Sequence, residues 1–249
     1  MKTSLFLLAL MLIGGPTIAQ TDNPVTMRTS EWSPYIDQSL PNQGLAMELV
    51  THIFARAGYR IDNTIEPFFN ALEDVTLGKA DMLGAAWRDD ARDERFIYSK
   101  PYLMNELVVI QRSDTSDRHY SLGAMSDSRI GLIQDYAYGV DFSELPGAEL
   151  VYETNIAQNL KNLLDNKVDF VVGDRRVIAM AVAQSLSEYR DSFAVAAISL
   201  PPRALYVAGS RAVPRPAGLV NEFNAALAEV KRDGSYHQII EKWQARFPL

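Results

Sequence analysis

Segments with strand and helix periodicity alternate along almost the whole of this 249-residue chain. The two halves also share a short pattern. A predicted helix, a turn with Lys and Asp, and a short apolar strand occur at 71–83 and again at 160–172, where LGKADML compares with DNKVDFV. Alternation of this kind produces mainly parallel sheets with helices on both faces. We therefore expect an α/β fold with two related lobes.

The predicted elements are short and follow one another closely. Apolar or alternating runs predict strands at 25–29, 59–66, 82–86, 107–111, 129–134, 150–153, 168–173 and 204–208. The spacing of apolar residues predicts helices at 44–58, 69–77, 155–166, 177–187, 217–232 and 235–247, with a further helix beginning in 136–142. Ligands bind such sheets outside the carboxyl ends of the strands. The residues that fall at these ends, and that we expect to face one cleft, are Trp32, Trp87, Gln134 and Asp174.

The first 19 residues have the pattern of a secretory signal peptide. Lys2 supplies a positive charge, residues 5–13 form a compact apolar run, and small residues precede Gln20. The run is shorter than the roughly 20 residues that span a membrane. The sequence contains no cysteine, which excludes disulfides, thiolate metal sites and a lipid-modified anchor. We therefore expect a soluble protein exported to a bacterial periplasm.

Charge and missing motifs limit the classes of function. A formal net charge of −7 argues against nucleic-acid binding, which depends on clustered Lys and Arg. Three scattered histidines indicate no metal site, and no signal points to a cofactor. The sequence lacks a G-x-S-x-G elbow, an H-E-x-x-H motif and a cysteine nucleophile, so we assign no catalytic residues and do not expect an enzyme. An enzyme that needs only a positioned acid and base would carry none of these motifs.

Three arginines follow the predicted strand at 82–86 within eight residues: Arg88, Arg92 and Arg95. A guanidinium group at a strand end suits a planar anion, because its fork donates two parallel hydrogen bonds to a carboxylate. The alternative is that these arginines pair with the neighbouring acids at 89–94 on a solvated surface, where ion pairs are individually weak. The residues alone leave both interpretations open.

Segments across almost the whole mature chain resemble family 3 of the bacterial extracellular solute-binding proteins, the polar amino-acid-binding components of ABC importers. The matching segments are EWSPY, GLAMELVTHIFARAGY, GKADML, ARDERFIYSKPY, NKVDFVVGD and VNEFNAALAEVKRDGSYHQIIEKW. The resemblance implies a type II periplasmic-binding-protein-like fold, in which two lobes joined by two hinge strands close over a ligand. It places lobe 1 at 20–104 and 203–249, lobe 2 at 105–202, and the crossings near 104–106 and 200–203.

The resemblance also implies a function. A monomeric protein would capture a small polar, amino-acid-like ligand between its lobes and deliver it to an ABC permease at the inner membrane. Two alternatives share the fold. One is a solute sensor or accessory protein for a membrane signalling partner, and the other is a periplasmic dehydratase-like enzyme.

Individual residues carry over from the family pattern. Arg92 matches the arginine that binds the ligand carboxylate, and Asp174 matches the aspartate that holds its amino group. Trp32 falls where the family places a stacking aromatic, with Phe68 or Phe69 as the opposite wall. Replacing Arg92 or Asp174 by Ala is expected to abolish ligand-induced stabilisation and to leave the unliganded protein nearly unchanged. Two alternatives remain, because Asp174 could N-cap the helix that follows it and Trp32 could belong to the core.

The chain departs from the family pattern at the expected site. Ala85 and Trp87 stand where small hydroxyl residues are usual, and residues 134–137 replace a glycine and hydroxyl residues in the second lobe. An aromatic, cationic or modified ligand therefore fits better than an ordinary free amino acid. The expected ligand-binding residues are Trp32, Phe68, Phe69, Ala85, Trp87, Arg92, Gln134, Tyr136 and Asp174.

Overall fold

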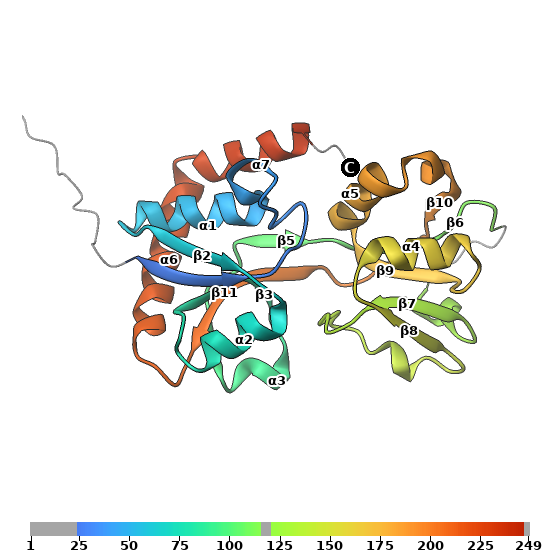
Figure 1. The fold of residues 1–249 in the computed structure, drawn as a ribbon, viewed down its shortest axis with the longest axis horizontal. Helices are drawn as coiled ribbons and strands as arrows, with labels where there is room; N and C mark the ends of the chain where they lie inside the picture. Colours follow the sequence, from blue (N-terminus) through green and yellow to red (C-terminus); the bar gives the residue numbers. More distant parts are fainter. Residues whose placement is uncertain (1–23, 116–120, 247–249) are drawn as a thin grey trace, which may run out of the picture.

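Two β-sheets lie side by side along the molecule, with helices around each of them (Figure 1). The computed structural model describes residues 24–115 and 121–246, so the predicted signal peptide at 1–19 lies outside the described residues. The chain passes from the first sheet to the second between β5 (Leu103–Asn105) and β6 (Leu107–Arg112), and it returns before β11 (Arg203–Ser210). This arrangement agrees with the expected two-lobed α/β fold.

The first sheet has the strand order β2-β1-β3-β11-β4, and β5 also pairs with β11. Its other strands are β1 (Val25–Thr29), β2 (Ile61–Ile65), β3 (Met82–Trp87) and β4 (Phe96–Tyr98). β1 runs parallel to β2 and β3, and Met27 lies opposite Met82. Every second residue of β1 is buried, so one face of this strand packs into the core.

The second sheet has the strand order β10-β6-β9-β7-β8. Its strands besides β6 are β7 (Arg129–Ile133), β8 (Glu149–Glu153), β9 (Phe170–Asp174) and β10 (Phe193–Val195). β7 is parallel to both β8 and β9. All five residues of β9 are buried: an apolar run in the centre of a covered sheet, followed by Asp174 at its end.

Both sheets are mixed, which corrects the prediction of mainly parallel sheets. β11 is antiparallel to β3, β4 and β5, and β6 is antiparallel to β9 and β10. β6 and β11 enter directly from the other lobe, without the crossover helix that a parallel connection requires. The strands β2, β1 and β3 do pair in parallel, and so do β8, β7 and β9. The carboxyl ends of these strands face the region between the lobes (Figure 1).

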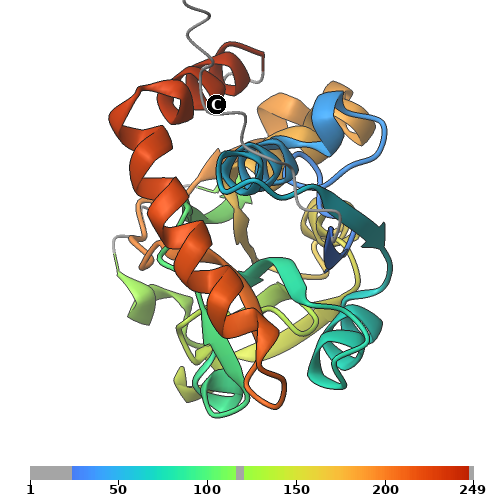
Figure 2. The ribbon, with the colours of Figure 1, turned by 90° about the vertical axis from the view of Figure 1, so that its left-hand side faces the viewer.

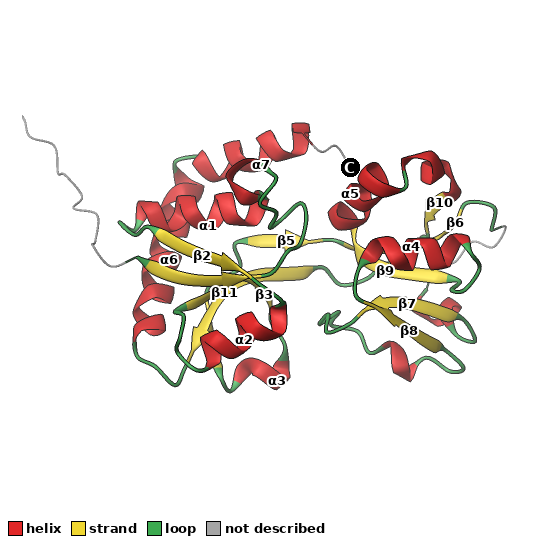
Figure 3. Cartoon of the chain, viewed as in Figure 1, coloured by secondary structure: helices red, strands yellow, loops and turns green. Residues whose placement is uncertain are grey.

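The helices cover the sheets (Figure 3). They are α1 (Leu45–Arg56), α2 (Phe68–Thr76), α3 (Asp90–Asp93), α4 (Ile156–Leu164), α5 (Arg175–Ser185), α6 (Arg215–Arg232) and α7 (Ser235–Arg246). Short 3-10 helices occur at Pro41–Gln43, Leu122–Met125, Phe142–Glu144 and Ser187–Ser192. Figure 2 shows the long helix α6 crossing the outer side of the first lobe, and its Phe223 ring lies 5.0 Å from Phe54 of α1. Within the described ranges, no helix is long and apolar enough to cross a membrane.

No α-helix begins in 136–142, where only the short 3-10 helix Phe142–Glu144 starts, so the prediction of a regular helix there was wrong. Asp135 and Gly139 have φ values of 63° and 72°, in the left-handed region that interrupts a helix. Tyr138 turns inward instead, where its hydroxyl accepts from the Ile133 amide at 2.8 Å and donates to the Val172 carbonyl at 3.3 Å. The segment after β7 is therefore a turn held by a buried tyrosine.

Candidate ligand-binding site

A cavity of about 730 Å³ lies between the lobes. First-lobe residues that border it are found at 30–33, 65–68, 85–87, Arg92 and Leu205, and second-lobe residues at 133–137, 154–157, Val177, Met180, Ala181, Gln184 and Ser185. Most of these segments directly follow β1, β2, β3, β7 or β8. The cavity is therefore where the predicted topology places a ligand, outside the carboxyl ends of parallel strands.

Arg92 supplies a buried positive charge to this cavity. It lies in α3 and is 9 % exposed. Its Nη2 donates to Asp89 Oδ2 at 3.2 Å, and its guanidinium carbon lies 5.6 Å from the centre of the Phe68 ring. Its Nε is buried and has no hydrogen-bond partner among the described residues. A buried donor without an acceptor is costly, so an anion bound here would satisfy it.

The neighbouring arginines behave differently. Arg88 is exposed and forms a bidentate pair with Asp93, in which Nε donates to Oδ1 at 2.8 Å and Nη2 donates to Oδ2 at 2.6 Å. Arg95 is exposed as well, and neither residue borders the cavity. The surface ion-pair interpretation therefore describes Arg88, whereas Arg92 lies at the cavity.

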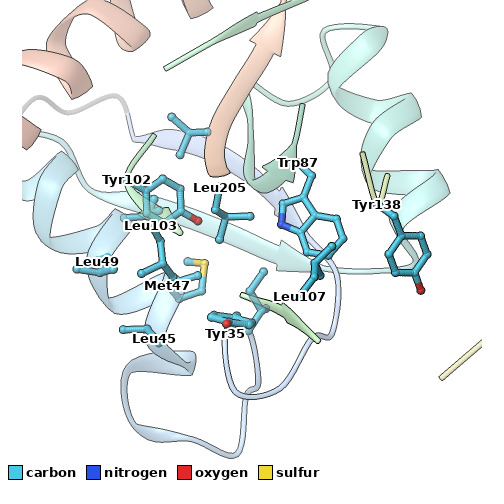
Figure 4. Packing of buried hydrophobic residues seen from close by; sticks show 14 of the residues in the cluster. Tyr35, Leu45, Met47, Leu49, Trp87, Tyr102, Leu103, Leu107, Tyr138 and Leu205 are labelled. Carbon is cyan, nitrogen blue, oxygen red and sulfur yellow. The ribbon is translucent and has the colours of Figure 1, made fainter. Parts of the chain in front are cut away.

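Aromatic rings from both lobes meet at the cavity wall. Trp32 and Trp87 of the first lobe lie 5.4 Å apart at 86°. Tyr136 of the second lobe packs on both, at 5.1 Å from Trp87 and 6.3 Å from Trp32. Burial raises the pKa of the Tyr136 hydroxyl well above its usual range. Figure 4 shows the inner side of this wall, where Trp87 lies among buried hydrophobic residues that include Leu107.

Asp174 does not border the cavity. It is 1 % exposed and N-caps α5, where its Oδ1 accepts from the amides of Arg176 at 2.9 Å and Val177 at 3.0 Å. The Tyr35 hydroxyl donates to the same carboxylate at 2.9 Å and 3.0 Å, and Asn105 Nδ2 donates to Oδ2 at 3.0 Å. Burial raises the pKa of Asp174 despite these donors. The N-cap alternative from the sequence is thus present in the structure.

Trp87 links the cavity wall to this buried carboxylate. Its indole Nε1 donates to Asn105 Oδ1 at 2.9 Å, and Asn105 donates in turn to Asp174. Asn105 ends β5, directly before the chain crosses to the second lobe. The hydrogen-bonded set of Trp87, Asn105, Asp174 and Tyr35, which we call the hinge network, therefore joins residues of both lobes.

The other predicted site residues are only partly brought together. Phe68, Ala85 and Gln134 border the cavity with Trp32, Trp87, Arg92 and Tyr136. Phe69 is 73 % exposed and does not border it, since adjacent residues of a helix face different directions. No group of histidine, aspartate or glutamate side chains suited to a metal ion occurs in the part of the chain that the structure describes.

Residues 26–246 match the sequence pattern of family 3 of the bacterial extracellular solute-binding proteins. The chain belongs to this family. The membership predicted from the sequence segments is thereby confirmed, and it covers both lobes.

Relatives of this family 3 protein are distant in sequence. The L-cystine-binding protein TcyA of Bacillus subtilis is 20% identical over 203 residues, which are 80% of this chain and 72% of TcyA. The substrate-binding protein AbpA of Streptococcus pneumoniae, solved with L-arginine, superposes with a TM-score of 0.71 at 19% identity, covering 88% of this chain and 93% of that one. The VFT2 domain of Bordetella pertussis BvgS gives 0.73 at 20% identity, covering 88% and 92%. These structural likenesses show the shared fold.

Several residues that border the cavity of this family 3 protein were not among those predicted from the sequence. Glu31, Glu66, Thr154 and Asn155 border the cavity because they follow β1, β2 and β8. The same strand-end rule could have found them. Tyr35 and Asn105 had weaker signals: Tyr35 lies in the EWSPY segment, and Asn105 is a polar residue in the predicted crossing at 104–106.

Proposed function

We propose that this protein is a periplasmic solute-binding protein that captures a small amino-acid-like ligand between its lobes for delivery to an ABC importer. The observation that carries the proposal is the buried Arg92 at a cavity bordered by both lobes, whose Nε has no acceptor among the residues that the structure describes. A ligand carboxylate would complete that site and contact both lobes at once. The names of TcyA and of arginine-bound AbpA support an amino-acid-like ligand.

A sensor is the second candidate. It rests on the likeness to the VFT2 domain of BvgS and to the larger BvgS periplasmic domain, of which this chain covers 42%. Capture of the solute would be the same in both cases, and only the membrane partner would differ. The proposal has four further parts. They are the division into lobes at 104/105 and 202/203, the signal peptide at 1–19, the monomeric state and the lack of catalysis.

A thermal-shift screen tests the proposal. The exported protein is unfolded and refolded to remove bound ligand, then melted with amino acids, their derivatives, polyamines and short peptides. Ligand at a thousandfold excess over Kd stabilises the folded state by about 4 kcal/mol. We expect a clear rise in Tm for one chemical class that contains a carboxylate.

Paired arginine variants show whether a hit uses the proposed site. Arg92→Gln should weaken binding by roughly tenfold to a hundredfold, because a charge-assisted hydrogen bond contributes about 1.5–3 kcal/mol. Arg88→Gln is the matched control, from the same loop but exposed and paired with Asp93. Equal affinities for the two variants would place the ligand elsewhere.

A second experiment separates import from signalling. It measures the uptake of the labelled ligand found in the screen by cells with and without the protein.

A further inference from the structure

One wall of the cavity is a face of the helix α5. The residues of this helix that border the cavity are Val177, Met180, Ala181, Gln184 and Ser185. Their spacing of three and four residues places them on the same side of the helix. From Val177 to Ser185 the helix rises by about 12 Å, at about 1.5 Å per residue. The cavity therefore extends along most of α5, away from the hinge network at its first turn.

This extent suits a ligand that is longer than a compact free amino acid. An extended chain advances roughly 3.3–3.6 Å per residue, so a face of about 12 Å matches about three residues of chain. The volume of about 730 Å³ agrees, because it lies in the upper half of the range of roughly 300–1,000 Å³ that is usual for drug-sized ligands. A ligand that contacts the whole lining therefore has a part that lies along α5.

The charged residues of the lining lie on the other side of the cavity. Glu31, Glu66 and Arg92 belong to the first lobe, and Asp135 belongs to the turn after β7. Within the described ranges, no charged side chain of α4 or α5 borders the cavity. The carboxylate and the ammonium group of an amino acid thus find oppositely charged side chains only away from these two helices.

The wall made by the two helices is apolar and neutral polar. We call it the helical wall, and it consists of the five α5 residues together with Thr154, Asn155, Ile156 and Ala157 at the start of α4. Met180 is 7 % exposed and supplies apolar surface, whereas Gln184 is exposed at the cavity. The amide of Gln184 has both donors and an acceptor, so it matches an amide group of a ligand.

We infer that the helical wall is a second subsite, which takes an uncharged, amide-linked extension of an amino-acid side chain. The ligand is then a side-chain conjugate of an amino acid and not a small free amino acid. The extension is on the side chain because the α-carboxylate and the α-ammonium both have charged partners elsewhere in the lining. This inference rests on the proposed function and narrows its ligand class.

Matched ligands of different length test the inference. The exported protein is titrated calorimetrically with L-glutamine and its γ-benzylamide, and with L-lysine and Nε-benzoyl-L-lysine. We expect each conjugate to bind roughly tenfold to a hundredfold more tightly than its parent, because burying an aromatic ring has that effect. γ-Glutamylglycine, whose extension ends in a carboxylate, should gain less than about twofold over L-glutamine. Parents that bind as tightly as their conjugates, or an equal gain for γ-glutamylglycine, would overturn the inference.

Variants of α5 show whether the extension lies on the helical wall. The quantity compared is the ratio of the Kd of L-glutamine to that of its γ-benzylamide. Ala181→Phe adds a ring on the wall and should lower this ratio at least about tenfold. Ala183→Phe is the matched control, because Ala183 is exposed on the same helix and does not border the cavity. It should leave the ratio within about twofold, and equal ratios for the two variants would contradict the assignment.

A second variant covers the case in which Ala181→Phe disturbs the helix. Ala181 also packs against the core of the second lobe, whereas Gln184 is exposed. Gln184→Leu keeps the size of the side chain and removes its amide. The ratio should fall roughly twofold to tenfold, as expected for the loss of one neutral hydrogen bond. An unchanged ratio in Gln184→Leu would remove the amide from the proposed ligand class.

The outcomes also separate this inference from the proposed function. If the thermal-shift screen finds a free amino acid that binds at least as tightly as the conjugates, a solute-binding protein remains and only the narrower ligand class is lost. If neither the conjugates nor any member of the screen binds, the proposed function fails and the inference fails with it.

Discussion

Arg92 and Asp174 are the two charged residues that the family pattern assigns to one ligand, and the structure separates them. Arg92 keeps a buried Nε donor at the cavity that has no partner within the described part of the chain, whereas four donors within the protein occupy Asp174. Removing the Asp174 carboxylate would leave those donors without an acceptor. The expectation that Asp174→Ala hardly affects the unliganded protein is therefore replaced by an expected loss of stability.

The raised pKa of Asp174 makes a prediction about pH. Burial is the main cause, while the Val177 amide, Asn105 and Tyr35 act in the opposite direction. A raised folded-state pKa means that the folded protein takes up the proton first, so this carboxyl costs stability at neutral pH. The cost is relieved as pH falls through the raised pKa toward the usual value of 3.8.

Urea unfolding of wild type and Asp174→Asn at a series of pH values measures this effect. The free energy of unfolding of wild type, minus that of the variant, should increase as pH falls from 7 toward 4. Other carboxyl groups titrate in both proteins and cancel from the difference. A difference that does not change with pH, or that decreases on acidification, would contradict the assignment.

At the scale of elements, the start of α1 determines where Tyr35 lies. The first amides of the helix donate to loop carbonyls: Leu45 to Pro34 at 3.0 Å and Ala46 to Tyr35 at 2.9 Å. Gly44 permits this close approach with a φ of 102°. A Cβ atom added there would lie 2.5 Å from the Tyr35 carbonyl oxygen. The N-terminus of α1 and the loop after β1 therefore form one unit, which holds the Tyr35 hydroxyl against Asp174.

Gly44→Ala should destabilise the protein by about 2–3 kcal/mol, because this backbone region is essentially restricted to glycine and the added methyl group meets a carbonyl. For a domain of this size, that corresponds to a fall in Tm of roughly 4–12 °C. Gly218→Ala in α6 is the matched control, since nothing lies within 4 Å of its added Cβ and Ala favours a helix. Scanning calorimetry of both variants gives the comparison. Equal melting temperatures would show that Gly44 is not constrained by the loop.

On the scale of the whole molecule, the lobes contact each other beside the cavity. Tyr136 packs against Trp32 and Trp87, and Tyr35 donates to Asp174 across the lobes. A ligand that contacts both lobes would change the packing of the aromatic rings at the cavity. Closure of two lobes around a shared site is a hinge motion, and the hinge network lies where the chain crosses at Glu106.

Tryptophan fluorescence reports on this closure. Trp32 and Trp87 border the cavity, whereas Trp243 lies in α7, where its Nε1 donates to Glu48 at 2.7 Å. Saturating ligand should change the emission of wild type and of Trp243→Phe by similar amounts. The change should be smaller in Trp32→Phe and in Trp87→Phe, because each removes one of the two indoles at the cavity. A signal that is lost only in Trp243→Phe would mean that the ligand acts at the C-terminal helices.

The sequence by itself determined the order and type of the longer elements, the family, and most of the cavity wall. Strand and helix periodicity depends on near neighbours, so α1, β3 and α6 could be read from local patterns. The strand-end rule then located Trp32, Trp87 and Gln134, because the ends of parallel strands meet at one edge of a sheet.

Only the tertiary structure decided which polar groups meet. Tyr35 and Asn105 reach Asp174 from 139 and 69 residues away in the chain, and no local pattern encodes such distant partners. The antiparallel direction of β6 and β11 and the inward turn of Tyr138 depend on the same long-range packing. An aspartate looks the same in a sequence whether its carboxylate is free to bind a ligand or already accepts hydrogen bonds from the protein at all its acceptor sites. The donors that surround it after folding make that difference.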